Sequence, residues 1–269
     1  MDGEAEGHGL MLLQDLLATG SGALVGFMLG LIGGGGSILA VPLLVYVVGV
    51  QSPHVAIGTS AVAVALSAFV NLVGHARAGN VKWRCALVFA TAGVAGAAVG
   101  STLGKSFDGE KLLALFGLLM VVIAMLMLFK GGEDGDINVR LTRASAPHLA
   151  PLLLGYGAAV GALSGFFGIG GGFLVVPGLL AATGMPMIYA IGSSLVSVTA
   201  FGLTTAGNYA LSGMVDWALV AFFIAGGIVG GIAGRCAGTR LSGSRQALSK
   251  IFAIGVATVG VYVFWRAAF

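Results

Sequence analysis

The chain has 269 residues, of which 58% are hydrophobic and only 9% are charged, and its formal net charge is +3. Soluble domains carry about one quarter charged residues, so this composition and a mean hydropathy of +1.03 exclude a soluble globular protein. The 47 glycines show neither a Gly-X-Y period nor a high proline content, which excludes collagen-like and disordered repeats. The composition predicts an all-α polytopic membrane protein.

The first segment, MDGEAEGHGL, contains acids where a secretory signal carries Lys or Arg, so we expect no cleaved signal. A bilayer core is spanned by about 20 apolar residues of helix. Segments of about that length are predicted, in chain order, at residues 10–31, 53–74, 84–104, 111–129, 149–167, 187–209, 217–238 and 246–265.

Two shorter apolar segments, residues 36–49 and 171–184, begin at glycine-rich runs. A helix of that length covers about 20 Å, less than the roughly 30 Å of a bilayer core, so each is expected to stop inside the membrane. They bring the predicted total to about ten crossings. A polar linker, residues 131–147, separates a first repeat, residues 1–130, from a second, residues 148–269.

The two halves repeat one another in sequence. The run GGGGSILAVP, which begins at Gly33, is echoed by GIGGGFLVVP, which begins at Gly168. AIGTS (residues 56–60) aligns with AIGSS (residues 190–194), and Trp83 aligns with Trp217, at an offset of about 134 residues. Glycines 93, 96 and 100 align with glycines 227, 230 and 234, and both sets are expected to be helix-packing surfaces.

Basic residues indicate how the repeats are inserted. Five crossings in each half place the second half upside down relative to the first. With the N-terminus outside and the linker in the cytoplasm, ten of the 13 basic residues lie inside, and only Lys105, Lys111 and Arg266 lie outside. If the short segments do not cross, the basic residues show no bias. The positive-inside rule therefore favours inverted repeats, which are typical of secondary transporters with a site near the midplane.

The glycine runs are the predicted binding site. Two helix N-termini that meet inside the membrane would offer unpaired N–H groups and positive dipole ends to an anion. We expect backbone donors at Gly33, Gly34, Gly35 and Gly36 and at Gly168, Gly170, Gly171 and Gly172. Ile169 interrupts the second run, which predicts a larger contribution from the first.

Hydroxyl side chains could add donors to this site. Ser37 is expected to cap the first broken helix, and the repeated motif supplies Thr59, Ser60, Ser193 and Ser194. The alternative for each is a hydrogen bond to a carbonyl of its own helix. His75, Arg77, Lys82 and Arg84 could gather anions at the cytoplasmic mouth, although topology alone requires a basic inner loop. Lys105 and Arg235 are expected to snorkel to the membrane surface.

The doubled run ending in Val-Pro, the repeated Ile-Gly-Thr/Ser-Ser and the Trp that follows a short polar loop resemble the TauE/SafE sulfite exporter family over about residues 16–265. The resemblance implies transport of small sulfur-containing anions, such as sulfite, sulfoacetate or related organosulfonates, across a bacterial inner membrane. We therefore expect a secondary transporter that exports such an anion by alternating access. The alternatives are an anion channel and a structural membrane protein without transport.

No catalytic motif, phosphate-binding loop or metal-ligand spacing is found, so an enzyme, a cofactor and a metal site are not expected. Cys85 and Cys236 suggest neither a disulfide framework nor a zinc site. The expected partners are a small anion and the lipid bilayer rather than nucleic acid, and the sequence leaves a homo-oligomer open.

Overall fold

The computed structural model describes residues 2–129, 145–240 and 245–268, and within these ranges every regular element is helical. The all-α expectation is therefore confirmed, while most of the predicted linker lies outside the described residues. The first half contains α1 (Asp2–Ile32), η1 (Gly33–Leu39), α2 (Ala40–Pro42), η2 (Leu43–Val47), α3 (Pro53–Arg77), α4 (Trp83–Ser106) and α5 (Gly109–Phe129). The second half contains α6 (Ala146–Phe167), α7 (Gly172–Thr183), α8 (Met187–Ala210), α9 (Trp217–Arg240) and α10 (Arg245–Ala268).

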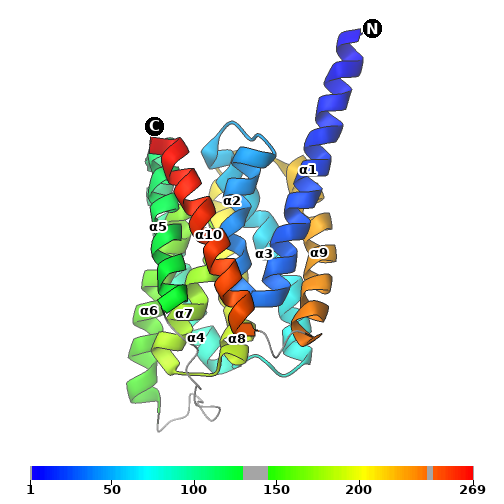
Figure 1. The fold of residues 1–269 in the computed structure, drawn as a ribbon. Helices are drawn as coiled ribbons and strands as arrows, with labels where there is room; N and C mark the ends of the chain where they lie inside the picture. Colours follow the sequence, from blue (N-terminus) through cyan, green and yellow to red (C-terminus); the bar gives the residue numbers. More distant parts are fainter. Residues whose placement is uncertain (1, 130–144, 241–244, 269) are drawn as a thin grey trace.

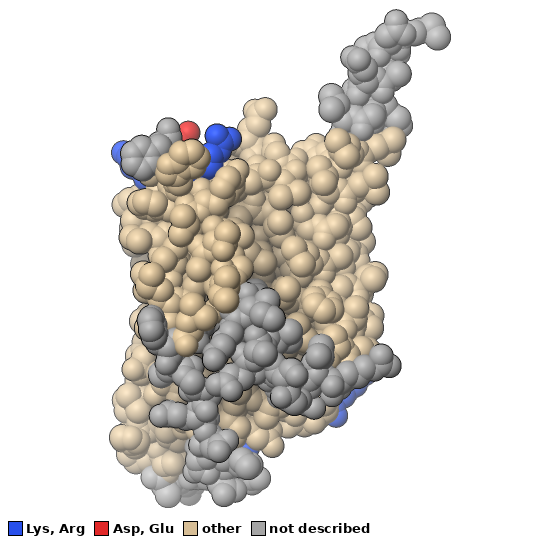
Figure 2. Space-filling model, viewed as in Figure 1, with Lys and Arg blue, Asp and Glu red and all other residues tan. Residues whose placement is uncertain are grey.

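Seven helices of the described chain, α1, α3, α4, α5, α6, α8 and α9, are long and apolar enough to cross a membrane. Their outer faces expose large apolar side chains such as Leu16, Val99 and Val229, which are stable in contact with lipid rather than water. Figure 2 shows charged side chains near both ends of the visible face, and the described atoms between them are uncharged. The molecule is a multi-pass membrane protein.

The bundle is built around α3 and α8. Their apolar windows are 78% and 61% buried, against 33–44% for the other five spans. Around them, α1 packs most extensively against α9, α4 against α6, and α5 against α10 (Figure 1). Both chain ends lie at the upper end of Figure 1, and the loop formed by residues 78–82 lies at the lower end.

Contacts between the helices give their relative directions. Thr59, near the start of α3, bonds the loop that follows α8, and Ser193, near the start of α8, bonds the loop that follows α3. Helices α3 and α8 therefore run antiparallel. In α5 and α10, Gly117 packs on Phe264 while Met120 packs on Gly260, so this pair is also antiparallel.

Glycines allow the two most extensive helix contacts, those of α1 with α9 and of α4 with α6. A Cβ built at Gly22, Gly26 or Gly30 of α1 would collide with backbone of α9, at Phe223, Gly227 or Gly231. Gly157, Gly161 and Gly165 of α6 meet Phe89, Gly93 and Ala97 of α4 in the same way. The packing role expected for the sets at residues 93–100 and 227–234 is confirmed, because their helices approach within backbone contact.

The two short elements differ from each other. The first was expected as a helix that begins at the glycine run, but η1 continues directly from α1 as a tight helical turn, followed by α2 and η2. The absence of a side chain at Gly36 lets the chain fold back against Met28 and Leu29 of α1, where a Cβ would overlap backbone. Ser37 consequently lies inside η1 and not at a helix cap, which corrects the expectation for that residue.

Candidate functional site

The second glycine run breaks the chain between α6 and α7. Gly168, Gly170 and Gly171 have φ angles of +68°, +66° and +71°, which residues with a side chain rarely adopt. Gly168 ends α6, and Gly171 precedes the first residue of α7 without any side-chain cap. A helix of 12 residues thus begins abruptly at Gly172, close to the start of the segment predicted at residues 171–184.

This break leaves backbone donors unused. Gly168 N donates to Gly165 O and Ile169 N to Ser164 O, and the helical ladder resumes when Leu174 N and Val175 N donate to Gly171 O. Within the described residues, no backbone acceptor is found for the N–H groups of Gly170, Gly171, Gly172 and Phe173. All four residues are buried. Buried N–H groups without partners are rare and costly, so this position calls for a ligand or bound water.

Ser164 adds a side-chain hydroxyl at the same place. Its side chain is fully buried, and its Oγ has no hydrogen-bond partner among the described residues. The Oγ and Cβ of Ser164 are the atoms closest to where a Cβ of Gly171 would stand. Sequence reasoning missed this residue because its counterpart in the first half is Leu29, so the repeat gave no signal for it.

The surroundings of these donors are apolar. Val64 of α3 and Val198 of α8 border Gly170, and Phe201 of α8 borders Gly171. A Cβ at Gly170 would stand 3.2 Å from Val64 Cγ1, so the space beside the backbone is narrow. In such a low-dielectric place, the N–H groups and the positive end of the α7 dipole interact strongly with negative charge. The arrangement can hold a small anion without a buried cation.

The first glycine run is joined to this site through contacts between η1 and α7. Gly36 and Ser37 are buried, whereas nothing is described of the surroundings of Gly33, Gly34 and Gly35. The second run has an open helix N-terminus at Gly171 and Gly172. That the first run contributes more stays a prediction.

The repeated hydroxyls have partners within the protein. Thr59 Oγ1 accepts a hydrogen bond of 3.0 Å from Asp216 N, and Ser193 Oγ accepts one of 2.9 Å from Lys82 N. These two bonds tie the start of each central helix to the loop before α9 or α4. Gly58 and Gly192 allow the same loops to approach, since a Cβ there would collide with the carbonyl oxygen of Met214 or Asn80.

The second hydroxyl of each pair bonds its own helix. Ser60 Oγ donates to Ile57 O at 2.9 Å, and Ser194 Oγ donates to Ile191 O at 2.7 Å. Gly168 packs against the side chain of Ile57, so Ser60 lies near the glycine run although its hydroxyl is already engaged. The structure thus places Gly171 beside Ser164 and gives Thr59, Ser60, Ser193 and Ser194 other partners.

Comparisons with known proteins identify the family of this chain. The family model described as "Sulfite exporter TauE/SafE" matches residues 18–263. A "Probable membrane transporter protein" of Xylella fastidiosa (strain Temecula1) is 52% identical over 95% of this chain and 97% of its own length.

More distant relatives carry the same description. The "Probable membrane transporter protein YunE" of Bacillus subtilis (strain 168) is 27% identical over 78% of this chain and 83% of its own length. "Probable membrane transporter protein MJ0441" of Methanocaldococcus jannaschii is 29% identical over 74% of this chain and 72% of its own length. No solved structure matches the chain significantly. The chain belongs to the TauE/SafE sulfite exporter family of membrane transporter proteins.

Proposed function

We propose that this protein is a secondary transporter that exports a small sulfur-containing oxyanion, such as sulfite, sulfoacetate or a related organosulfonate. The observation that carries the proposal is the start of α7, where the buried N–H groups of residues 170–173 and the hydroxyl of Ser164 have no partner in the described chain. Oxygen atoms of a sulfite or sulfonate group are suited to such donors, because they accept several hydrogen bonds at once. The substrate class follows the family description.

A site without a charged side chain suits transport. A buried cation would hold an oxyanion tightly through a strong Coulomb attraction, which slows release. Backbone donors and one hydroxyl bind the same group by hydrogen bonds and a helix dipole, each of moderate strength. The anion can therefore leave the site on the far side of the membrane.

Inverted repeats are the second part of the proposal. In the repeat, α1 corresponds to α6 and α4 corresponds to α9. Helix α1 of the first half packs on α9 of the second, and α6 of the second half packs in the same way on α4 of the first. The equivalent helices α3 and α8 run antiparallel, as do α5 and α10. Inversion accounts for both observations, and it assigns the upper end of Figure 1 to the outside and the lower end to the cytoplasm by the positive-inside rule. Transport then proceeds by rocking of the helices around the α7 site.

The proposal is tested in proteoliposomes loaded with sulfite, sulfoacetate, sulfate or chloride. The decisive variant is Gly171→Ala, because its Cβ would collide with the side chain of Ser164 and its backbone would be strained. We expect saturable efflux of a sulfur oxyanion from the wild type and loss of that efflux in Gly171→Ala.

The matched control is Gly155→Ala on α6, where a Cβ meets nothing within 4 Å. We expect it to retain the wild-type efflux. Non-saturating conductance would instead indicate a channel, and the absence of flux for every anion would leave a structural membrane protein. Either result would overturn the proposal, as would full activity in Gly171→Ala.

A further inference from the structure

A cavity of about 330 Å³ opens at the lower end of the bundle, away from the start of α7. Its walls come from the last turns of α1, α3 and α9, the loop after α3 and the first turns of α8. Most of the lining is apolar or glycine, including Leu31, Ile188, Ile191 and Ile232. The cavity borders the end of α1, the helix that directly precedes the first glycine run in the sequence.

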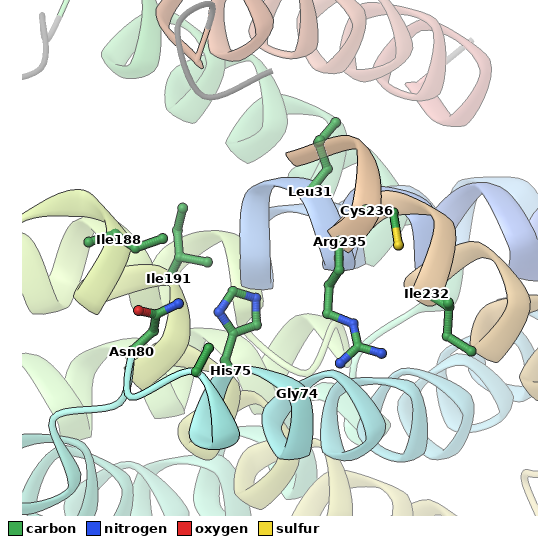
Figure 3. Close-up of a pocket in the computed structure, with 11 residues that line it drawn as sticks. Leu31, Gly74, His75, Asn80, Ile188, Ile191, Ile232, Arg235 and Cys236 are labelled. Carbon is green, nitrogen blue, oxygen red and sulfur yellow. The ribbon is translucent and has the colours of Figure 1, made fainter. Parts of the chain in front are cut away.

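Three side chains with N–H donors gather in this cavity, and none of its 11 lining residues is acidic. Figure 3 shows Arg235 extending from α9 toward α3, with His75 and Asn80 on the α3 side. Arg235 Nε is buried and has no hydrogen-bond partner among the described residues. A guanidinium keeps its charge in proteins and carries five N–H donors, so an unsatisfied donor in this apolar setting is costly.

At the opposite end of the molecule, the ammonium group of Lys105 has hydrogen-bond acceptors. Lys105, in the last turn of α4, donates to Asn208 O at 3.1 Å, to Asn208 Oδ1 at 2.6 Å and to Ser212 Oγ at 2.8 Å. In the repeat, Asn208 of α8 corresponds to Gly74 of α3. The guanidinium of Arg235 lies against this glycine, where a Cβ would overlap Nη1. The position that supplies an oxygen to Lys105 therefore supplies none to Arg235.

We propose that this cavity is a second anion-binding site, in which Arg235 binds a small oxyanion of the sulfate, sulfite or sulfonate type. The planar guanidinium matches two oxygens of such a group, and Asn80, whose amide carries N–H donors, lines the same cavity. The oxyanion supplies an acceptor for Arg235 Nε, which has no hydrogen-bond partner among the described residues. We assign the cavity as the place where anions bind before they reach the proposed transport site, and this role rests on the proposed function. Anion binding by Arg235 itself does not depend on transport.

The test uses sulfate, with chloride at equal ionic strength as the control, and the purified full-length protein. Cys236 also lines the cavity and is exposed, whereas Cys85 is buried, so maleimide labelling in a Cys85→Ala background reports on this place. We expect sulfate to slow labelling of Cys236 with a saturable dependence on concentration. An equal rate in sulfate and chloride would overturn the inference.

Variants separate this site from its surroundings. Arg235→Gln should raise the sulfate concentration for half-maximal protection by about ten-fold or more, since it removes charge-assisted hydrogen bonds. Arg235→Lys, which keeps the charge but loses the planar fork, should show an intermediate rise. Arg77→Gln removes the same charge from an exposed position at the same end of α3, and it should change the value by less than about two-fold. Equal effects of Arg77→Gln and Arg235→Gln would show charge screening and contradict a site.

The same preparations distinguish the two proposals. Protection that depends on Arg235 without any anion flux in proteoliposomes would keep the cavity site and overturn the transport function. If flux is saturable, is unchanged in Arg235→Gln and is accompanied by no protection of Cys236, the transport function is kept and the cavity site is overturned. If Arg235→Gln fails to fold, the labelling of the Cys85→Ala protein alone still decides the question.

Discussion

Some polar residues in this protein hold helices and loops together by hydrogen bonds, whereas others have donors without a partner in the described chain. Thr59 and Ser193 stand at equivalent positions and each accepts a hydrogen bond from a loop N–H, so the repeated motif is explained by helix-to-loop contacts. Sequence comparison of the two halves finds such residues because both copies make the same contact between a helix and a loop. It does not find Ser164, whose open hydroxyl depends on the left-handed turn at Gly170 and Gly171 and has no counterpart in the first half.

Ser164→Ala is expected to weaken anion binding without affecting the fold. The hydroxyl has no partner in the described chain, so its removal costs little stability in the absence of substrate. A hydrogen bond to a charged group contributes about 1.5–3 kcal/mol, which corresponds to a rise in the KM for sulfite efflux of about ten-fold or more. The measurement is saturation of efflux in proteoliposomes, together with the Tm in detergent. Ser60→Ala is the comparison, because that hydroxyl already bonds Ile57 O, and a larger rise in KM for Ser60→Ala would contradict the assignment.

At the scale of helices, hydropathy was sufficient to place nearly every element. The segment predicted at residues 187–209 is α8, Met187–Ala210, and the one at residues 217–238 is α9, Trp217–Arg240. These boundaries are predictable because apolar length and a Trp or Pro at the start mark them locally. The segment at residues 36–49 was not predictable in detail, since a run of four glycines has no strong preference and its path follows from contact with α1.

Close helix packing predicts opposite effects for glycines on the same helix. Gly26→Ala on α1 should lower the Tm, because its Cβ would collide with Gly227 O of α9 and overpacking typically costs about 1–3 kcal/mol. Gly161→Ala on α6 should do the same through Gly93 of α4. The matched controls are Gly20→Ala and Gly155→Ala, where a Cβ meets nothing within 4 Å, and alanine's higher helix propensity should leave their Tm equal or higher. Similar Tm values for Gly26→Ala and Gly20→Ala would exclude close α1–α9 packing.

For the whole molecule, the two ends differ although the repeats are alike in sequence. At the upper end, Lys105 joins α4 to α8, and Asn208 Nδ2 donates to Ser101 Oγ at 2.7 Å, so these helices are held together. Neither Lys105 nor Arg235 simply snorkels, because the first bonds α8 and the second faces a cavity. Such a difference between the ends is what alternating access requires, in which one end is closed while the other is open. In the described structure, Lys105 joins α4 to α8 at one end, and a cavity borders Arg235 at the other.

Lys105→Met should therefore shift the proposed equilibrium toward a conformation that is open at the upper end. The substitution removes three hydrogen bonds that are made only while α4 and α8 are joined, and each 1.4 kcal/mol lost changes the ratio of conformations about ten-fold. Because the cavity would close in the same step, maleimide should label Cys236 several-fold more slowly in Lys105→Met than in the wild type. Lys111→Met removes the same charge from an exposed position at the same end, so its labelling rate should equal that of the wild type. An unchanged rate in Lys105→Met would show that the two ends do not move together, and rocking around the α7 site would then fail as the mechanism.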